Sequence, residues 1–223
     1  MADLRLPDAP GPHPVAILVH GGGWADPYTR DLMDGAAVDL AARGTATWNI
    51  EYRRIPPVGG WRDSMADVTA AVGALSSISG DHRLDLDRVT VIGHSAGAQL
   101  GFFAAKTASV RPAGFVTLAG MLDLENVGSG FDGLISAFLG DDRHARLPAV
   151  DPIRALPSGV PTVAVHGLMD RSVAPEQSRR FVKAALAAGD RSHLVEVLEA
   201  DHMDVISPLA AGWEEVAHAC LGA

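Results

Sequence analysis

The sequence predicts a single α/β domain built around a mostly parallel β-sheet. Short apolar runs rich in β-branched residues alternate with longer helical stretches along the chain, which is typical of a parallel sheet covered by helices. The 223 residues are 48% hydrophobic, enough to bury one sizeable core. No internal repeat, charge block or proline-rich linker divides the chain, so residues 1–223 are interpreted as one domain.

The hydrophobic pattern places about six strands and five helices along the chain. The strands are expected near residues 15–20, 45–51, 88–93, 113–119, 160–166 and 193–198, and the helices near 29–43, 62–78, 96–108, 175–188 and 208–220. Helix ends are expected at Gly44, Gly80 and Gly189. About fourteen residues precede the first strand, which leaves no room for a leading hairpin.

The most informative motif is Gly93-His94-Ser95-Ala96-Gly97, which stands between an expected strand and an expected helix. A serine on a tight strand-to-helix turn needs neighbours almost free of side chains, and Gly93 and Gly97 meet that need. The pattern G-x-S-x-G in this context is typical of a nucleophile elbow. We therefore expect Ser95 to be a catalytic nucleophile.

A second glycine-rich motif, His20-Gly21-Gly22-Gly23-Trp24, follows the first expected strand. Glycines allow backbone N–H groups to approach a substrate oxygen closely, as an oxyanion hole requires. We expect the N–H groups of Gly22 and Gly23 to donate to that oxygen, together with the N–H of Ala96. The alternative is a glycine-rich turn without a catalytic role.

An acid and a histidine follow the serine in the order that acyl-transfer sites on such sheets use. Asp170 comes just after the expected strand near 160–166, and His202 follows the last expected strand. His202 would take the proton of Ser95 and return it to the leaving group, while Asp170 would orient the imidazole. The sequence therefore predicts a Ser95–His202–Asp170 triad.

Other residues compete for these roles. Asp123 also follows a strand and is the alternative acid, whereas Asp201 is interpreted as a solvated turn residue. His94 is expected to pack beside the oxyanion loop, and His20 and His166 to hold loops by hydrogen bonds.

Composition excludes several classes of function. The formal charge of −9 argues against nucleic acid or an anionic membrane surface as a partner. No secretion signal and no run of about 18 apolar residues is present, and the one cysteine, Cys220, cannot form an internal disulfide, so a cytoplasmic location is expected. No metal-ligand spacing or dinucleotide motif implies a metal or cofactor.

These residues together resemble the α/β-hydrolase superfamily, in its esterase/lipase branch. That branch includes hormone-sensitive-lipase-like enzymes and kynurenine formamidases. The resemblance rests on the two glycine motifs, on Asn49-Ile-Glu-Tyr-Arg53, and on Asp170 and His202. It implies a three-layer α/β-hydrolase fold with a minimal N-terminus and a short lid. Members of the most similar subset hydrolyse aryl formamides, small esters or acylated amines.

Substrate contacts are expected from Trp24, Met121, Leu122 and Met203, which lie near the predicted site by their motif positions. They would form an apolar pocket for a small neutral substrate that carries an acyl group. Trp24 has the alternative of packing its loop against the core. Residues 120–150 are interpreted either as a short lid, with an amphipathic helix over the site, or as a plain connection.

The sequence thus predicts a serine hydrolase that cleaves small carboxylic esters or formamides through an acyl-enzyme on Ser95. One alternative is an acyltransferase or cyclase that uses the same acyl-enzyme with another nucleophile. A second alternative is a non-catalytic small-molecule receptor of the same fold. Either a monomer or a homodimer is compatible with the sequence.

Overall fold

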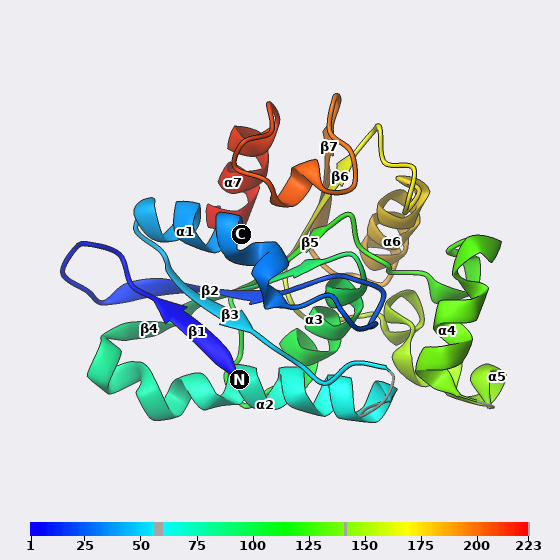
Figure 1. Ribbon diagram of the computed structural model, residues 1–223, viewed down its shortest axis with the longest axis horizontal. Helices are drawn as coiled ribbons and strands as arrows, with labels where there is room; N and C mark the ends of the chain where they lie inside the picture. Colours follow the sequence, from blue (N-terminus) through cyan, green and yellow to red (C-terminus); the bar gives the residue numbers. More distant parts are fainter. Residues whose placement is uncertain (56–59, 141, 223) are drawn as a thin grey trace.

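In the computed structural model, which describes residues 1–55, 60–140 and 142–222, the described chain forms one seven-stranded sheet (Figure 1). The strands are β1 (Ala2–Arg5), β2 (His13–Val19), β3 (Ala46–Ile50), β4 (Leu84–His94), β5 (Gly114–Leu118), β6 (Thr162–Gly167) and β7 (Ser192–Val197). They lie side by side in the order β1-β3-β2-β4-β5-β6-β7. β1 runs antiparallel to β3, and the other described pairs are parallel, which confirms the predicted sheet.

The six predicted strands are present, and β1 is an additional strand that the sequence did not predict. Its four residues, Ala-Asp-Leu-Arg, have no buried side chain and no clear period of two. β1 exists through its pairing with the edge of β3, in which Ala2 lies opposite Ile50 and Arg5 opposite Thr47. The segment before β2 is therefore short but adds a strand to the sheet.

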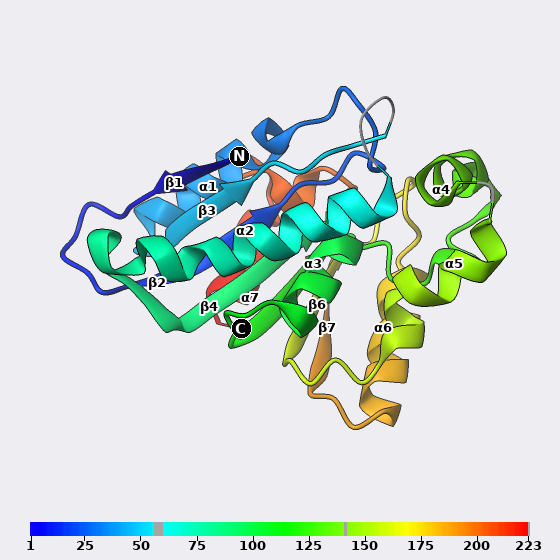
Figure 2. The same ribbon diagram turned by 90° about the horizontal axis from the view of Figure 1, so that it is seen from below.

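Helices cover both faces of the sheet (Figure 1 and Figure 2). They are α1 (Asp34–Ala42), α2 (Trp61–His82), α3 (Ala96–Thr107), α4 (Asp132–Leu139), α5 (Arg143–Val150), α6 (Glu176–Ala187) and α7 (Trp213–Leu221). Alternate residues of β2 face opposite layers: Ala16 and Leu18 pack in the cluster with α1 and α7, while Ile17 packs in the cluster with α2, α3 and α6. The three-layer prediction is confirmed.

Three predicted helix boundaries differ from the structure. The stretch 29–43 begins with a 3₁₀ turn, Arg30–Met33, and becomes α-helical only at Asp34. α2 continues past Gly80 and ends at His82, and the capping residue after it, Arg83, adopts a left-handed conformation with φ of 51°. The last helix begins at Trp213 rather than near 208, because the residues around Pro208 form turns.

The predicted lid segment, residues 120–150, contains two helices, and its residue 141 lies outside the described residues. The expected amphipathic helix is confirmed as α4, and α5 was not predicted.

Asp151 follows α5, is fully buried, and accepts a hydrogen bond from the Leu124 N–H at 3.0 Å. Its Oδ2 has no hydrogen-bond partner among the described residues.

Asp151 makes stability depend on pH. Burial raises the pKa of this carboxyl from 3.8 to about 6. A raised folded-state pKa stabilises the fold fully below about pH 4, and that contribution is lost as the pH rises through 6. At pH 8 the buried charge should lower the free energy of unfolding by about 3 kcal/mol. Asp151→Asn keeps an acceptor for Leu124 and should raise the melting temperature at pH 8 more than at pH 4.

Thermal melts at both pH values test this prediction. Asp142→Asn is the matched control because Asp142 is an exposed carboxyl beside the same helix. It should change the melting temperature little at either pH. An Asp151→Asn shift of equal size at pH 4 and pH 8 would show that the charge of Asp151 is not the cause.

Candidate active site

Ser95 lies on a sharp turn between the end of β4 and the start of α3. Its φ of 51° and ψ of −120° are unusual for a residue with a side chain, and such backbone strain costs about 1–3 kcal/mol. The flanking glycines are required by close packing. A Cβ on Gly97 would lie 2.2 Å from the Val19 carbonyl oxygen, and a Cβ on Gly93 would lie 2.5 Å from the Ala98 Cα. The G-x-S-x-G spacing therefore has a direct steric reason.

His202 and Asp170 meet beyond the ends of β7 and β6. The Nδ1 of His202 lies 2.7 Å from Asp170 Oδ2, so it donates to the carboxylate and leaves Nε2 as an acceptor. The other oxygen, Oδ1, accepts the N–H groups of Ser172 and Val173 at 2.8 and 2.9 Å. Burial raises the pKa of Asp170, but hydrogen bonds from its histidine neighbours outweigh this and hold it well below its usual range. Asp170 is therefore a carboxylate.

A second histidine, His166, also contacts Asp170 and stands four residues before it in the chain. Its Nε2 lies 2.9 Å from the Val173 carbonyl oxygen and 3.3 Å from Asp170 Oδ2. Its Nδ1 lies 2.7 Å from Ser178 Oγ. Because both partners of Nε2 are acceptors, His166 donates from Nε2 and accepts at Nδ1. The sequence suggested a loop-holding role for His166 but not that it holds the predicted acid.

His94, directly before Ser95, reaches the loop that carries His202. Its Nε2 donates to the His202 carbonyl oxygen at 2.9 Å, and the two rings are 4.8 Å apart. Burial, and then the nearby His202, lower the pKa of His94 to about 3, so its ring is neutral. A Cβ on Gly21 would lie 2.7 Å from His94 Nδ1, so the ring also packs beside the glycine loop that follows β2, as predicted.

The glycine loop after β2 presents unused backbone donors. Gly22 and Gly23 have φ of 104° and 61°, which favour glycine. In the described part of the chain, no backbone hydrogen bond uses the N–H of Gly22, Gly23 or Ala96. A Cβ on Gly22 would lie 2.3 Å from Tyr28 Cβ, so the loop has no space for a side chain there. These donors have the character that an oxyanion hole requires.

Buried polar contacts hold the direction of this loop. His20 lies 2.8 Å from the Gly21 carbonyl oxygen through Nδ1 and 3.0 Å from Glu51 Oε1 through Nε2. A carboxylate can only accept, so Nε2 donates to Glu51, while Nδ1 lies against the Gly21 carbonyl oxygen. Tyr52 stacks on His20 at 4.3 Å, and its hydroxyl donates to the His20 carbonyl at 2.9 Å. Since C=O and N–H point in opposite directions in a trans peptide, anchoring the Gly21 oxygen also orients the Gly22 N–H.

Glu51 anchors this arrangement as a charged group. It also accepts the backbone N–H groups of Arg30 and Tyr52, each at 3.1 Å. Burial raises the pKa of Glu51, but the hydrogen bonds from His20 and the Arg30 N–H outweigh it, and the pKa falls to about 2. Sequence reasoning missed this role, although Glu51 stands inside the Asn49–Arg53 motif that carried part of the resemblance.

The competing carboxylates have other partners. Asp123 accepts the Arg180 Nε at 2.8 Å and the Asn126 amide at 2.9 Å. Asp201 accepts two backbone N–H groups of its own turn, at 2.8 and 3.0 Å. Of the three carboxylates considered for the acid, Asp170 is the one that contacts the His202 ring in the described chain.

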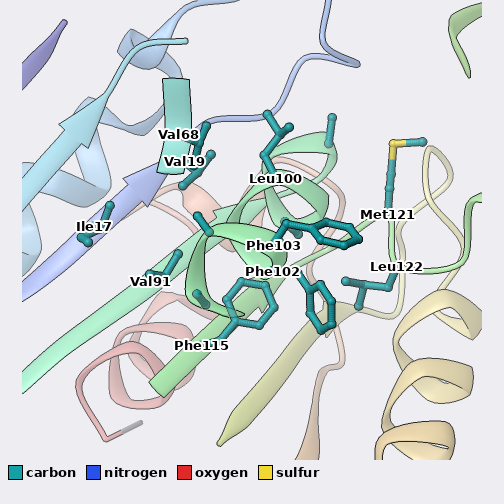
Figure 3. Close-up of a cluster of buried hydrophobic side chains, with 14 of the residues drawn as sticks. Ile17, Val19, Val68, Val91, Leu100, Phe102, Phe103, Phe115, Met121 and Leu122 are labelled. Atoms are coloured by element: carbon teal, nitrogen blue, oxygen red, sulfur yellow. The ribbon is translucent and has the colours of Figure 1, made fainter. Parts of the chain in front are cut away.

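The predicted substrate contacts are mostly buried. Trp24, Met121 and Leu122 have no accessible surface, and Figure 3 shows the latter two in a hydrophobic cluster. Trp24 stacks on Phe138 at 4.3 Å, so in this structure it packs its loop against other side chains and offers no face to a substrate. Met203 is 44% exposed beside His202. The position of Trp24 in this structure therefore fits the alternative interpretation of this residue, a packing role.

The described residues contain neither a membrane-spanning helix nor a cluster of metal ligands. No helix among them is long and apolar enough to cross a membrane. No group of three or more His, Cys, Asp or Glu residues in the described ranges could hold a metal ion.

The fold is the α/β-hydrolase fold, and Ser95, Asp170 and His202 follow one another in the order that this fold uses for its site. A solved bacterial heroin esterase has the same fold, with a TM-score of 0.84, 23% identity, and coverage of 99% of this chain and 77% of that one. At the level of families, residues 2–123 match the BD-FAE family model, and the chain belongs to that family.

Two curated relatives match this chain over part of their own length. Esterase LipQ of Mycobacterium tuberculosis is 29% identical over 207 residues, which cover 83% of this chain and 49% of LipQ. Kynurenine formamidase avaC of Aspergillus versicolor is 31% identical over 130 residues, covering 50% of this chain and 44% of avaC. The chain thus spans about half the length of these two relatives or less.

Proposed function

We propose that this protein cleaves small carboxylic esters or formamides through an acyl-enzyme on Ser95. The observation that carries the proposal is the 2.7 Å contact between His202 Nδ1 and a charged Asp170, which leaves Nε2 free to accept a proton. The strained backbone of Ser95 and the unused N–H groups of the glycine loop support it further. The names of the similar esterase and formamidase agree with this chemistry.

In the first half of the proposed reaction, Ser95 Oγ attacks the substrate carbonyl carbon while its proton passes to His202 Nε2. The carbonyl π electrons move onto the oxygen, which accepts hydrogen bonds from Gly22, Gly23 and Ala96. Each donor contributes about 3 kcal/mol to lowering the barrier. The bond to the leaving alcohol or amine then breaks, and the leaving group takes the proton from His202.

In the second half, water attacks the acyl-serine and gives a proton to His202. The ester bond to Ser95 breaks, the acid leaves, and His202 returns the proton to Ser95 Oγ. Each step uses side chains and backbone groups of this chain together with water. The proposed substrate is a small neutral molecule with an acyl group. An alcohol or amine in place of this water would turn the same acyl-enzyme into an acyltransferase.

The proposal is tested by labelling with a fluorophosphonate, which phosphonylates an activated serine. Intact mass should show one adduct per chain, and peptide mapping should assign it to the peptide that contains Ser95. An adduct on a different serine, or none at all, would contradict the proposal. In the latter case, lack of turnover would favour the receptor alternative.

The substrate class follows from a kinetic panel. We expect turnover of p-nitrophenyl esters of short acids, and comparison with N-formylkynurenine separates esterase from formamidase preference. Added alcohols or amines should not divert the acyl group, since water is the proposed acceptor. Formation of a new ester or amide as the main product would instead favour the acyltransferase.

A further inference from the structure

The α4–α5 segment packs directly on the oxyanion loop. A Cβ built on Gly23 would lie 3.1 Å from Leu134 Cδ1, so the Leu134 side chain of α4 lies against this glycine. Ile135 and Phe138, on the same helix, are fully buried, whereas Leu134 is half-buried. Leu134 is therefore an apolar side chain that contacts the predicted oxyanion hole and remains partly accessible.

A buried clamp holds α4 and α5 in this place. Trp24, next to Gly23, stacks on Phe138 with ring centroids 4.3 Å apart and planes 12° apart. The Trp24 indole N–H donates to Gln99 Oε1 at 3.1 Å, and the Gln99 amide donates to the Val150 carbonyl at 3.0 Å. Gln99 is fully buried on α3, about one turn after Ser95. The oxyanion loop, α3 and the α4–α5 segment are thus joined through the core, so Leu134 lies on a fixed wall.

The proposed chemistry decides which part of a substrate meets this wall. The leaving group takes its proton from His202, so it must lie on the side of the loop that follows β7. Figure 1 and Figure 2 both show α4 set apart from that loop. With the carbonyl oxygen at the N–H of Gly23, the remaining substituent of the carbonyl carbon, the acyl chain, lies toward Leu134.

We propose that Leu134 sets the upper size of the acyl group, so that the site favours short acyl chains. This inference rests on the proposed ester hydrolysis and adds the substrate's acyl class to it. A longer or branched chain would have to displace a leucine side chain backed by buried Ile135 and Phe138, and a well-packed wall resists such insertion.

The test measures kcat/KM for p-nitrophenyl esters from acetate to octanoate. In the wild type, kcat/KM should fall steeply with acyl length. Leu134→Ala should raise the octanoate-to-acetate ratio at least tenfold, because a single methylene in an apolar pocket changes kcat/KM by about 10-fold to 200-fold. Leu134→Phe should lower the butyrate-to-acetate ratio. Ser136→Ala, at an exposed position of the same helix, should leave the profile unchanged.

A second ester series separates the possible outcomes. Acetate esters of alcohols of increasing length should keep their relative kcat/KM in both Leu134 variants. A shift in this series instead of the acyl series would overturn the assignment, and so would unchanged acyl profiles in variants that still hydrolyse acetate. Absence of hydrolysis of every ester by the wild type would contradict the proposed ester hydrolysis itself, and with it this inference. Thermal melts of both variants confirm that altered ratios come from folded protein.

Discussion

Replacing Ser95 with alanine is expected to lower kcat for ester hydrolysis by about 10⁵-fold to 10⁶-fold. Ser95 carries the oxygen that attacks the substrate carbonyl carbon in the first half of the proposed mechanism, and a water molecule in its place would lack the fixed position of a side chain. The glycine loop and its N–H groups would remain in Ser95→Ala, so weak binding and a small residual rate should persist. Initial rates with p-nitrophenyl acetate over a wide range of enzyme concentrations measure the loss.

A matched variant removes a serine hydroxyl elsewhere. Ser76 is exposed on α2, and its hydroxyl donates to the Gly73 carbonyl of the same helix. Ser76→Ala should keep the wild-type kcat. Substantial activity in purified Ser95→Ala, at melting temperatures equal to the wild type, would show that another group is the nucleophile.

Most of the fold and of the candidate site could be predicted from short motifs, because the physical causes of these motifs are local. The elbow could be predicted since Gly93 and Gly97 are required by atoms of adjacent elements around one turn. Likewise, the ends of parallel strands gather at one edge of the sheet, so Asp170 and His202 could be brought together from their chain order alone.

The features that could not be predicted, or whose alternatives stayed open, depend on contacts between distant residues. The position of Trp24 depends on Phe138 and Gln99, which no local pattern connects to the glycine loop. β1 has too few residues to show a period, and it forms only because the edge of β3 is available for pairing. α5 has eight residues and contains Pro148, so its apolar pattern is short and interrupted by a residue that disfavours helix interiors.

Hydrogen-bond donors at both carboxylate oxygens keep Asp170 in its charged form. Its Oδ2 accepts from His202 and faces the donating Nε2 of His166, while Oδ1 accepts two backbone N–H groups. This arrangement keeps the pKa of Asp170 low despite burial, and it fixes the carboxylate plane. The predicted acid therefore has both a set charge and a set orientation, which makes it sensitive to an uncharged replacement.

Replacing Asp170 with asparagine is expected to lower kcat by about 10⁴-fold. The N–H groups of Ser172 and Val173 require an oxygen at the Oδ1 position, so the amide nitrogen must take the place of Oδ2. That nitrogen donates to His202 Nδ1, which moves the imidazole proton to Nε2. His202 can then no longer accept the proton of Ser95, and the amide also faces the donor of His166. Steady-state kinetics with p-nitrophenyl acetate measure the loss.

Asp123→Asn is the matched control, because Asp123 is the competing acid and is also a buried carboxylate. It contacts Arg180 and Asn126 rather than His202, so its replacement should alter stability more than kcat. A large loss of kcat in Asp123→Asn together with a small loss in Asp170→Asn would identify Asp123, which follows β5, as the catalytic acid. That result would contradict the proposed role of the contact between Asp170 and His202 in catalysis. Because both variants remove one buried negative charge, a difference between them reports the position of the carboxylate and not its charge alone.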